Sequence, residues 1–470
     1  MQNSNTRKEN KMGVMPINKL LLTMALPLMI SMLVQALYNI VDSVFVGKIS
    51  QDAFNAVSLA FPLQNIIIAI GSGTGVGVNA LIARSLGEKD PEKANRYAAN
   101  GVFLGLASGF IMLFIGLFVS EPFFKSQTDN PVIIENGVKY LKICTCLSVF
   151  LIVQCLFERL LQSTGKTILS MYTQGIGAIV NIIFDPIFIF GFKMGVAGAA
   201  WATVLGQFCG MIAGFLLNEK FNKEISLKLK AMKPNLRFIG NIYKIGIPSI
   251  LMISVGSVMT YMMNKLFLSI EPTETATAVF NAYFKLQSFV VMPVIGLAHA
   301  LLPIVSYNYG AKNKARMLEA YKLGVLYALA VLSLGVLAML FIPELLLKMF
   351  SASDEMLKIG IPAFQIIAVS FLFTSYGIPT SNFFQAVGNG VLSMLLSLVR
   401  QLAVLVPVAY LLGYTIGYQA SWWAIPIAES TAAIVAVFGW FYIKRRILDK
   451  LPNEAPQVVS DAETAETLEE

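Results

Sequence analysis

Residues 20–44, LLLTMALPLMISMLVQALYNIVDSV, are an apolar stretch long enough to cross a lipid bilayer as one helix. The rest of the chain is similar: 56% of its 470 residues are hydrophobic, 13% are charged, and the mean hydropathy is +0.69. These stretches are continuous, whereas barrel strands alternate apolar and polar residues. We therefore predict an all-α membrane protein with about twelve transmembrane helices. The expected spans are residues 20–44, 55–82, 97–119, 138–161, 169–191, 196–217, 242–268, 279–305, 321–347, 360–385, 392–413 and 420–443.

The basic residues indicate a membrane topology. The formal net charge is +8, and Lys and Arg gather near both ends and after even-numbered spans, at residues 84–96, 220–237 and 312–316. The positive-inside rule therefore places both termini and the even-numbered connections in the cytoplasm. Because these residues form no binding patch, we expect the bilayer and no nucleic acid as a partner.

The two halves of the chain resemble each other. Four pairs of segments match in the same order at a nearly constant offset. They are ALP (25–27) with GIP (246–248), ARSLGEKD (83–90) with SYNYGAKN (306–313), LQSTGKTILSM (161–171) with FQAVGNGVLSM (384–394), and GVAGAAW (195–201) with GYQASWW (417–423). Each half carries roughly six spans, and an even number returns the chain to its starting side, so the halves enter the membrane in parallel.

This repeat predicts five parts. They are a cytoplasmic tail (1–19), a six-helix bundle (20–217), a cytoplasmic linker (218–241), a second six-helix bundle (242–446) and an acidic cytoplasmic tail (447–470). Transporters with such repeats bind substrate between the halves and expose it to each side in turn. The two bundles are therefore predicted to be pseudo-symmetric and to work by alternating access.

Polar residues in the first span share one helix face. Tyr38 and Asn39 lie three and four residues after Gln35, and four and three residues before Asp42. A charged side chain at the centre of a bilayer costs roughly 2.5 to 3.5 kcal/mol, so an embedded carboxylate is expected to have a function. The alternative is that Asp42 lies near the end of its span and is simply hydrated, but the polar stripe extends deeper than a cap requires.

Two later spans carry residues of the same type. Asn181 and Asp185 are four residues apart, and Pro186 frees a backbone carbonyl beside them. Thr203 and Gln207 repeat the four-residue step and add neutral oxygens. Carboxylate and neutral oxygens together suit Na⁺, which is a hard cation. They suit a proton equally, because burial disfavours the charged form of a carboxylate. The sequence does not separate H⁺ from Na⁺.

The second half lacks these carboxylates. Met263 or Asn264 is equivalent to Asp42, and Val408 is equivalent to Asp185. We therefore expect the first bundle to bind the coupling ion.

The other embedded ionisable residues are expected to pair with one another. They are Glu158, Arg159, Lys285, His299, Arg400 and Glu429. A substrate cavity is predicted to include Glu429, His299, Asn264 and Tyr261, with Met and aromatic side chains that suit apolar cations. His299 fits a hydrogen-bonded histidine better than a lone proton relay. The chain has no phosphate-binding loop and no metal-spaced histidine cluster, so we predict a transporter rather than an enzyme, without a cofactor or use of ATP.

Several motifs resemble the multidrug and toxic compound extrusion (MATE) family over residues 17–446, and in particular its MepA-like bacterial branch. The motifs are QALYNIVDSVFVG, LGEKDPEKA, LLQSTG, NIIFDPIFIFG, FKLQSFVVMPVIGL and YNYGAKN. The resemblance implies twelve helices in two bundles around a V-shaped cavity, in a bacterial cell membrane. It also implies H⁺- or Na⁺-coupled antiport of small cationic or amphipathic drugs and dyes by a functional monomer.

The family's cation site falls on Asp42, Asn181, Asp185 and Thr203, with Gln35, Tyr38 and Asn39 nearby. Some family members use carboxylates in the seventh, eighth or tenth helix, which this sequence lacks. The alternative function is a flippase for lipids or lipid-linked sugars in the same superfamily, which would favour a cavity rich in Arg and Lys.

Overall fold

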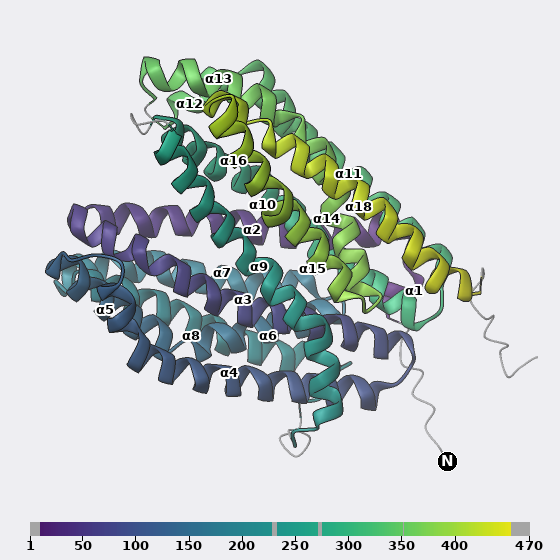
Figure 1. The fold of residues 1–470 in the computed structure, drawn as a ribbon. Coiled ribbons are helices and arrows are strands. Elements are labelled where there is room, and N and C mark those ends of the chain that lie inside the picture. The colour runs from purple at the N-terminus through teal and green to yellow at the C-terminus, as the bar shows by residue number, and fades with distance from the viewer. Residues whose placement is uncertain (1–9, 228–232, 271–274, 351, 453–470) are drawn as a thin grey trace, which may run out of the picture.

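The computed structural model describes residues 10–227, 233–270, 275–350 and 352–452, and every element in these ranges is helical (Figure 1). The helices are α1 (Lys11–Val14), α2 (Ile17–Gly47), α3 (Gln51–Gly87), α4 (Pro91–Lys125), α5 (Pro131–Cys146), α6 (Val149–Ser163), α7 (Thr167–Pro186), α8 (Val196–Phe221), α9 (Leu236–Ile270), α10 (Thr275–Gly310), α11 (Lys314–Phe341), α12 (Pro343–Lys348), α13 (Asp354–Ala368), α14 (Ser370–Ala386), α15 (Gly390–Leu398), α16 (Val406–Thr415), α17 (Tyr418–Ser421) and α18 (Ala424–Arg446). Two π-helical segments, Ile187–Gly191 and Val399–Leu405, continue α7 and join α15 to α16, and a short 3₁₀ turn spans Leu448–Lys450.

The expected count of about twelve membrane spans is confirmed. Within the described residues, ten helical segments are long and apolar enough to cross a membrane, and two bent helix pairs bring the number to twelve. The bent pairs are α5 with α6, at 44°, and α13 with α14, at 47°. They form the fourth span of each half, so even the bends are repeated.

Helices extend beyond the spans that hydropathy predicts. The first span is predicted over 20–44, whereas α2 runs from Ile17 to Gly47. Hydropathy detects the part of a helix in hydrocarbon, but a helix continues through the headgroup region until its backbone groups are capped. The predicted linker, 218–241, is shortened for the same reason: α8 continues to Phe221 and α9 begins at Leu236. Residues 228–232 of this linker, 1–9 of the first tail and 453–470 of the acidic tail lie outside the described residues.

The repeated motifs adopt the same local structure in both halves. Gln162 Nε2 donates to Ser170 Oγ at 2.9 Å, and the equivalent Gln385 Nε2 donates to Ser393 Oγ at 2.9 Å. The intervening turns place Gly165 and Gly388 at φ angles of +81° and +87°, which favour glycine. The motif therefore serves as a helix-to-helix turn closed by one side-chain hydrogen bond.

The two halves lie side by side at the end of the molecule near α1, called the terminal end below, and separate toward α5 and α13 (Figure 1). Helix α2 packs against α10, and α3 packs against both α9 and α10. At the terminal end, the Gly87 Cα faces the Tyr307 carbonyl so closely that an added Cβ would overlap it. Gly310 meets the Arg84 carbonyl in the same way. These contacts are reciprocal, as expected across an approximate twofold axis.

Helix α1 reinforces the contact between the halves. Asn10 Nδ2 donates to the Thr164 carbonyl of the first half at 3.4 Å. Arg316 Nη2, in the second half, donates to the Met12 and Met15 carbonyls at 3.1 and 2.7 Å. The chain before α2 thus bridges both halves at the terminal end.

Candidate cation site and central cavity

Four residues predicted to bind the coupling ion come together where α2, α7 and α8 meet. Asn181 Nδ2 lies 3.4 Å from Asp185 Oδ1 and 3.4 Å from Thr203 Oγ1. The Asp42 carboxyl group lies beside that of Asp185, close enough for the two to interact directly. The sequence places Asn181 and Asp185 on one helix face, and packing of α2 against α7 adds Asp42.

Several oxygens of this cluster have no protein partner. Asp42 Oδ1, Asp185 Oδ2 and Asn181 Oδ1 are each buried without a hydrogen bond to the described part of the chain. Buried acceptors without a donor are costly, so a bound cation or proton would stabilise them. Carboxylate and amide oxygens are ligands that a hard cation prefers.

The end of α7 is shaped for such a site. Pro186 follows Asp185 directly and has no N–H to donate. The next residues, Ile187–Gly191, form a π-helical turn in which the Phe192 N–H bonds back to the Ile187 carbonyl at 2.8 Å. Turns of this type interrupt the regular helical hydrogen bonds and are frequent at functional sites.

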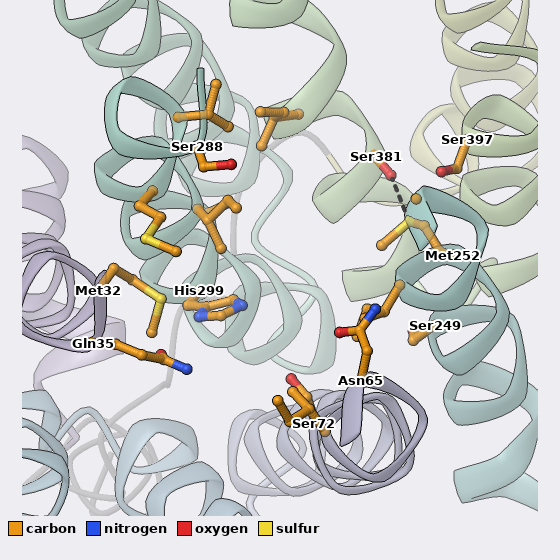
Figure 2. A pocket seen from close by; sticks show the side chains of 18 of the residues that line it. Met32, Gln35, Asn65, Ser72, Ser249, Met252, Ser288, His299, Ser381 and Ser397 are labelled. Carbon is orange, nitrogen blue, oxygen red and sulfur yellow. Dashed lines mark hydrogen bonds between the residues drawn. The ribbon is translucent and has the colours of Figure 1, made fainter. Parts of the chain in front are cut away.

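A cavity of about 660 Å³ lies between the two halves. In Figure 2, Gln35 of α2, Ser72 of α3 and His299 of α10 surround it together with Met252 of α9. Its volume is in the range of sites for drug-sized molecules. The predicted residues in its wall are Gln35, Tyr38, Asn181, Thr203, Gln207, His299 and Glu429.

The cation cluster lies behind this wall. Asn181 and Thr203 line the cavity, but Asp42 and Asp185 do not. Because Asn181 hydrogen-bonds to Asp185, it connects the cavity with the carboxylates. A ligand in the cavity and an ion at the carboxylates would therefore share the Asn181 side chain.

Three further predicted residues also lie outside the cavity wall. Asn39 is exposed, because one residue beyond Tyr38 turns a helical side chain by about 100°. Tyr261 is 68% exposed, and Asn264 follows it on α9 beyond Met259, the last α9 residue in the wall. These positions do not support a substrate role for Tyr261 and Asn264.

The embedded charges pair only in part as expected. Arg400 and Glu429 form an ion pair at 3.7 Å. Glu158 instead accepts a hydrogen bond from Gln154 Nε2 at 3.0 Å, and it has no ion-pair partner within the described ranges. Sequence neighbours on a helix point about 100° apart, which separates Glu158 from Arg159.

Arg159 connects the halves through neutral partners. Its guanidinium lies 2.9 Å from Gln162 Oε1, 3.1 Å from Ser72 Oγ and 3.3 Å from His299 Nε2. Arginine has only donors, so His299 accepts through Nε2 and is neutral in this arrangement. A hydrogen-bonded histidine was the favoured interpretation of the sequence.

The cavity wall also contains a set of amide side chains that were not predicted from the sequence. They are Asn65, Gln154, Gln174, Gln287, Asn382, Gln385 and Gln401. Gln174 Nε2 donates to Gln35 Oε1 at 2.9 Å, and Asn65 Nδ2 donates to Ser257 Oγ across the halves at 2.6 Å. The sequence did contain a signal for these residues, because an isolated amide side chain in an apolar span also needs a hydrogen-bond partner.

Replacing Thr203 by Val is expected to weaken binding of the coupling ion roughly five- to tenfold, because it removes one hydroxyl partner worth about 1 kcal/mol. The measurement is the ion concentration that gives half-maximal dye efflux. Thr173→Val is the matched control, since among the described residues the Thr173 hydroxyl donates only to the Leu169 carbonyl of its own helix. Equal effects of the two substitutions would contradict the role of Thr203.

Known proteins are similar to this chain along most of its length. The sequence model of the MatE family matches residues 27–187 and 245–411. Multidrug export protein MepA of Staphylococcus aureus strain MSSA476 is 27% identical over 433 residues, which are 92% of this chain and 95% of the relative. Multidrug export protein MepA of Staphylococcus haemolyticus is also 27% identical, over 432 residues, with the same two coverages.

Solved structures share the fold. A crystal structure of MATE in complex with MaL6 has a TM-score of 0.88 and 27% identity, covering 94% of this chain and 100% of that chain. An outward-facing multidrug resistance MATE family transporter of the MOP superfamily also has a TM-score of 0.88 and 27% identity, with coverages of 94% and 99%. A Pyrococcus furiosus transporter of that superfamily, described as having reversed pocket polarity, has the same TM-score, identity and two coverages.

Proposed function

The chain belongs to the MatE family, a family of membrane transporters, and we propose that it exports small cationic or amphipathic compounds in exchange for H⁺ or Na⁺. The carboxyl pair Asp42–Asp185 carries this proposal, because it lies directly behind a drug-sized cavity between two related bundles. An ion gradient can drive export only if the protein holds the ion at a defined site.

Exchange follows from the way the cavity and the cation cluster share residues. An ion bound between Asp42 and Asp185 can use the unpartnered Asn181 Oδ1 atom, and a cavity ligand competes for the same amide. Reciprocal coupling of two ligands requires such a shared element. Ion and drug then occupy the protein in turn as the halves rock about their contact.

The orientation completes the proposal. We place both termini and the basic connections in the cytoplasm of a bacterial cell, by the positive-inside rule. The terminal end, where the halves touch, then faces inward and the opposite end faces outward. Because one chain contains both the cavity and the cation cluster, we propose a functional monomer.

A flippase is less well supported. Its phosphate-bearing substrate would favour free arginines and lysines in the cavity. Here Arg159 is bonded to three neutral side chains, and Arg400 lies beside Glu429. Glu158 adds a carboxylate to the same wall.

Purified protein in sealed vesicles tests the function. We expect an imposed inward-directed gradient of H⁺ or Na⁺ to drive uptake or release of a cationic dye at least tenfold faster than in protein-free vesicles. Dissipating that gradient with an ionophore should remove the difference. Absence of dye movement with either gradient would contradict the proposed export.

A further inference from the structure

The second half of the cavity wall carries its own ion pair. Arg400, in the π-helical segment Val399–Leu405, faces Glu429 of α18, and both residues line the cavity. At the equivalent positions the first half has Gly177 and Gln207, which are also in the wall. The Arg400–Glu429 pair therefore has no charged counterpart at the equivalent positions of the first half.

The pair is loose for a buried ion pair. The Arg400 Nε and Glu429 Oε1 atoms are 3.7 Å apart, longer than a hydrogen bond, and Arg400 makes no hydrogen bond to any other described residue. Its side chain is 28% exposed, whereas that of Glu429 is 11% exposed. A structural arginine–carboxylate pair is usually short and bidentate. Arg400 thus neutralises Glu429 without being fixed to it by a hydrogen bond.

Arg400 lies in the π-helical segment Val399–Leu405 and lines the cavity. In this region the wall contains Leu396, Ser397, Arg400, Gln401 and Leu405. Ser397, Gln401 and Leu405 follow one another at steps of four residues, as on one face of a helix. Arg400 directly precedes Gln401, so two neighbouring polar side chains share the wall.

We propose that Arg400 is a specificity-determining residue that acts as a resident cation and competes with cationic substrates for Glu429. This inference rests on the proposed export of cations. A substrate reaches the Glu429 carboxylate only by displacing the guanidinium, so Arg400 lowers cation affinity and does so more strongly for doubly charged compounds. It also keeps Glu429 from holding a cation too tightly to be released.

Binding to the purified full-length protein tests the competition, with tetraphenylphosphonium as a single cation, methyl viologen as a dication and Nile red as an uncharged probe. Arg400→Gln is expected to tighten tetraphenylphosphonium binding roughly three- to tenfold, and methyl viologen binding by a larger factor. Glu429→Gln should weaken both cations. When Arg400→Gln is combined with Glu429→Gln, the gain in cation affinity that Arg400→Gln gives alone should disappear. Nile red should bind all variants equally.

Two further variants keep the result interpretable. Lys285→Gln removes one positive charge from an exposed position of α10 outside the cavity wall, and it should leave all affinities unchanged. Arg400→Met, which keeps the apolar stem of the side chain, replaces Arg400→Gln if that variant does not fold. An equal gain with and without Glu429, or weaker cation binding without Arg400, would overturn the inference. Failure of the wild-type protein to bind either cation would instead contradict the proposed export of cations.

Discussion

Replacing both Asp42 and Asp185 by Asn is expected to lower gradient-driven dye efflux by at least about tenfold. The two carboxyl groups lie beside each other, and together they provide the negative charge of the cation cluster. Neutral amides retain the shape of the site, but they have no negative charge to balance a bound H⁺ or Na⁺. The measurement is the rate of dye efflux from vesicles with an imposed gradient of H⁺ or Na⁺.

Asp90→Asn is the matched control for this double variant. Asp90 caps α4 by accepting a hydrogen bond from the Lys93 N–H, and Asn313 does the same for the Arg316 N–H in the second half. Asparagine is therefore tolerated at this equivalent position, and efflux should stay unchanged. Thermal unfolding should be similar for all variants, because removing buried charge is not expected to destabilise the fold. Full efflux by the double variant would exclude coupling through Asp42 and Asp185.

The helices were predictable because each membrane span must satisfy its own backbone hydrogen bonds. Their bends were not. The fourth span was predicted as one helix over 138–161, whereas the structure bends by 44° between Cys146 and Val149. Neither Leu147 nor Ser148 at this break is Pro or Gly, so the sequence carries no common signal for a kink.

The cation cluster was partly predictable. Helical spacing placed Asn181 and Asp185 on one face, but it cannot give the distance from Asp42 on another helix. The family resemblance supplied that link. Spacing also failed to separate Tyr38, in the wall, from exposed Asn39, because steps of three and four residues are both compatible with one face.

The cavity itself depends on how the two halves pack. The amide side chains in its wall come from several helices, and no spacing along one helix relates them. The expected mutual pairing of embedded charges was right for Arg400 and Glu429 but wrong for Glu158. Only the three-dimensional arrangement shows which charge has a partner and which faces the cavity without one.

Gly310→Val is expected to lower efflux at least about tenfold by preventing closure of the terminal end. A Cβ at Gly310 would overlap the Arg84 carbonyl, and backbone cannot move aside as a flexible side chain can. Overpacking of this kind typically costs about 1 to 3 kcal/mol, which shifts a two-state equilibrium by roughly five- to 150-fold. The halves should therefore separate at the terminal end, and alternating access requires that this contact closes in one state.

Spin labels at Glu92 and Ala315, two exposed and repeat-equivalent positions, report this separation directly. The distance between the labels should be longer in Gly310→Val than in the unsubstituted chain. Gly240→Val is the matched control, because Gly240 lies in α9 with no neighbouring atom within 4 Å of its Cβ position. An unchanged label distance together with lost efflux would show that Gly310 acts on folding or elsewhere. A longer distance with normal efflux would show that this contact is not needed for transport.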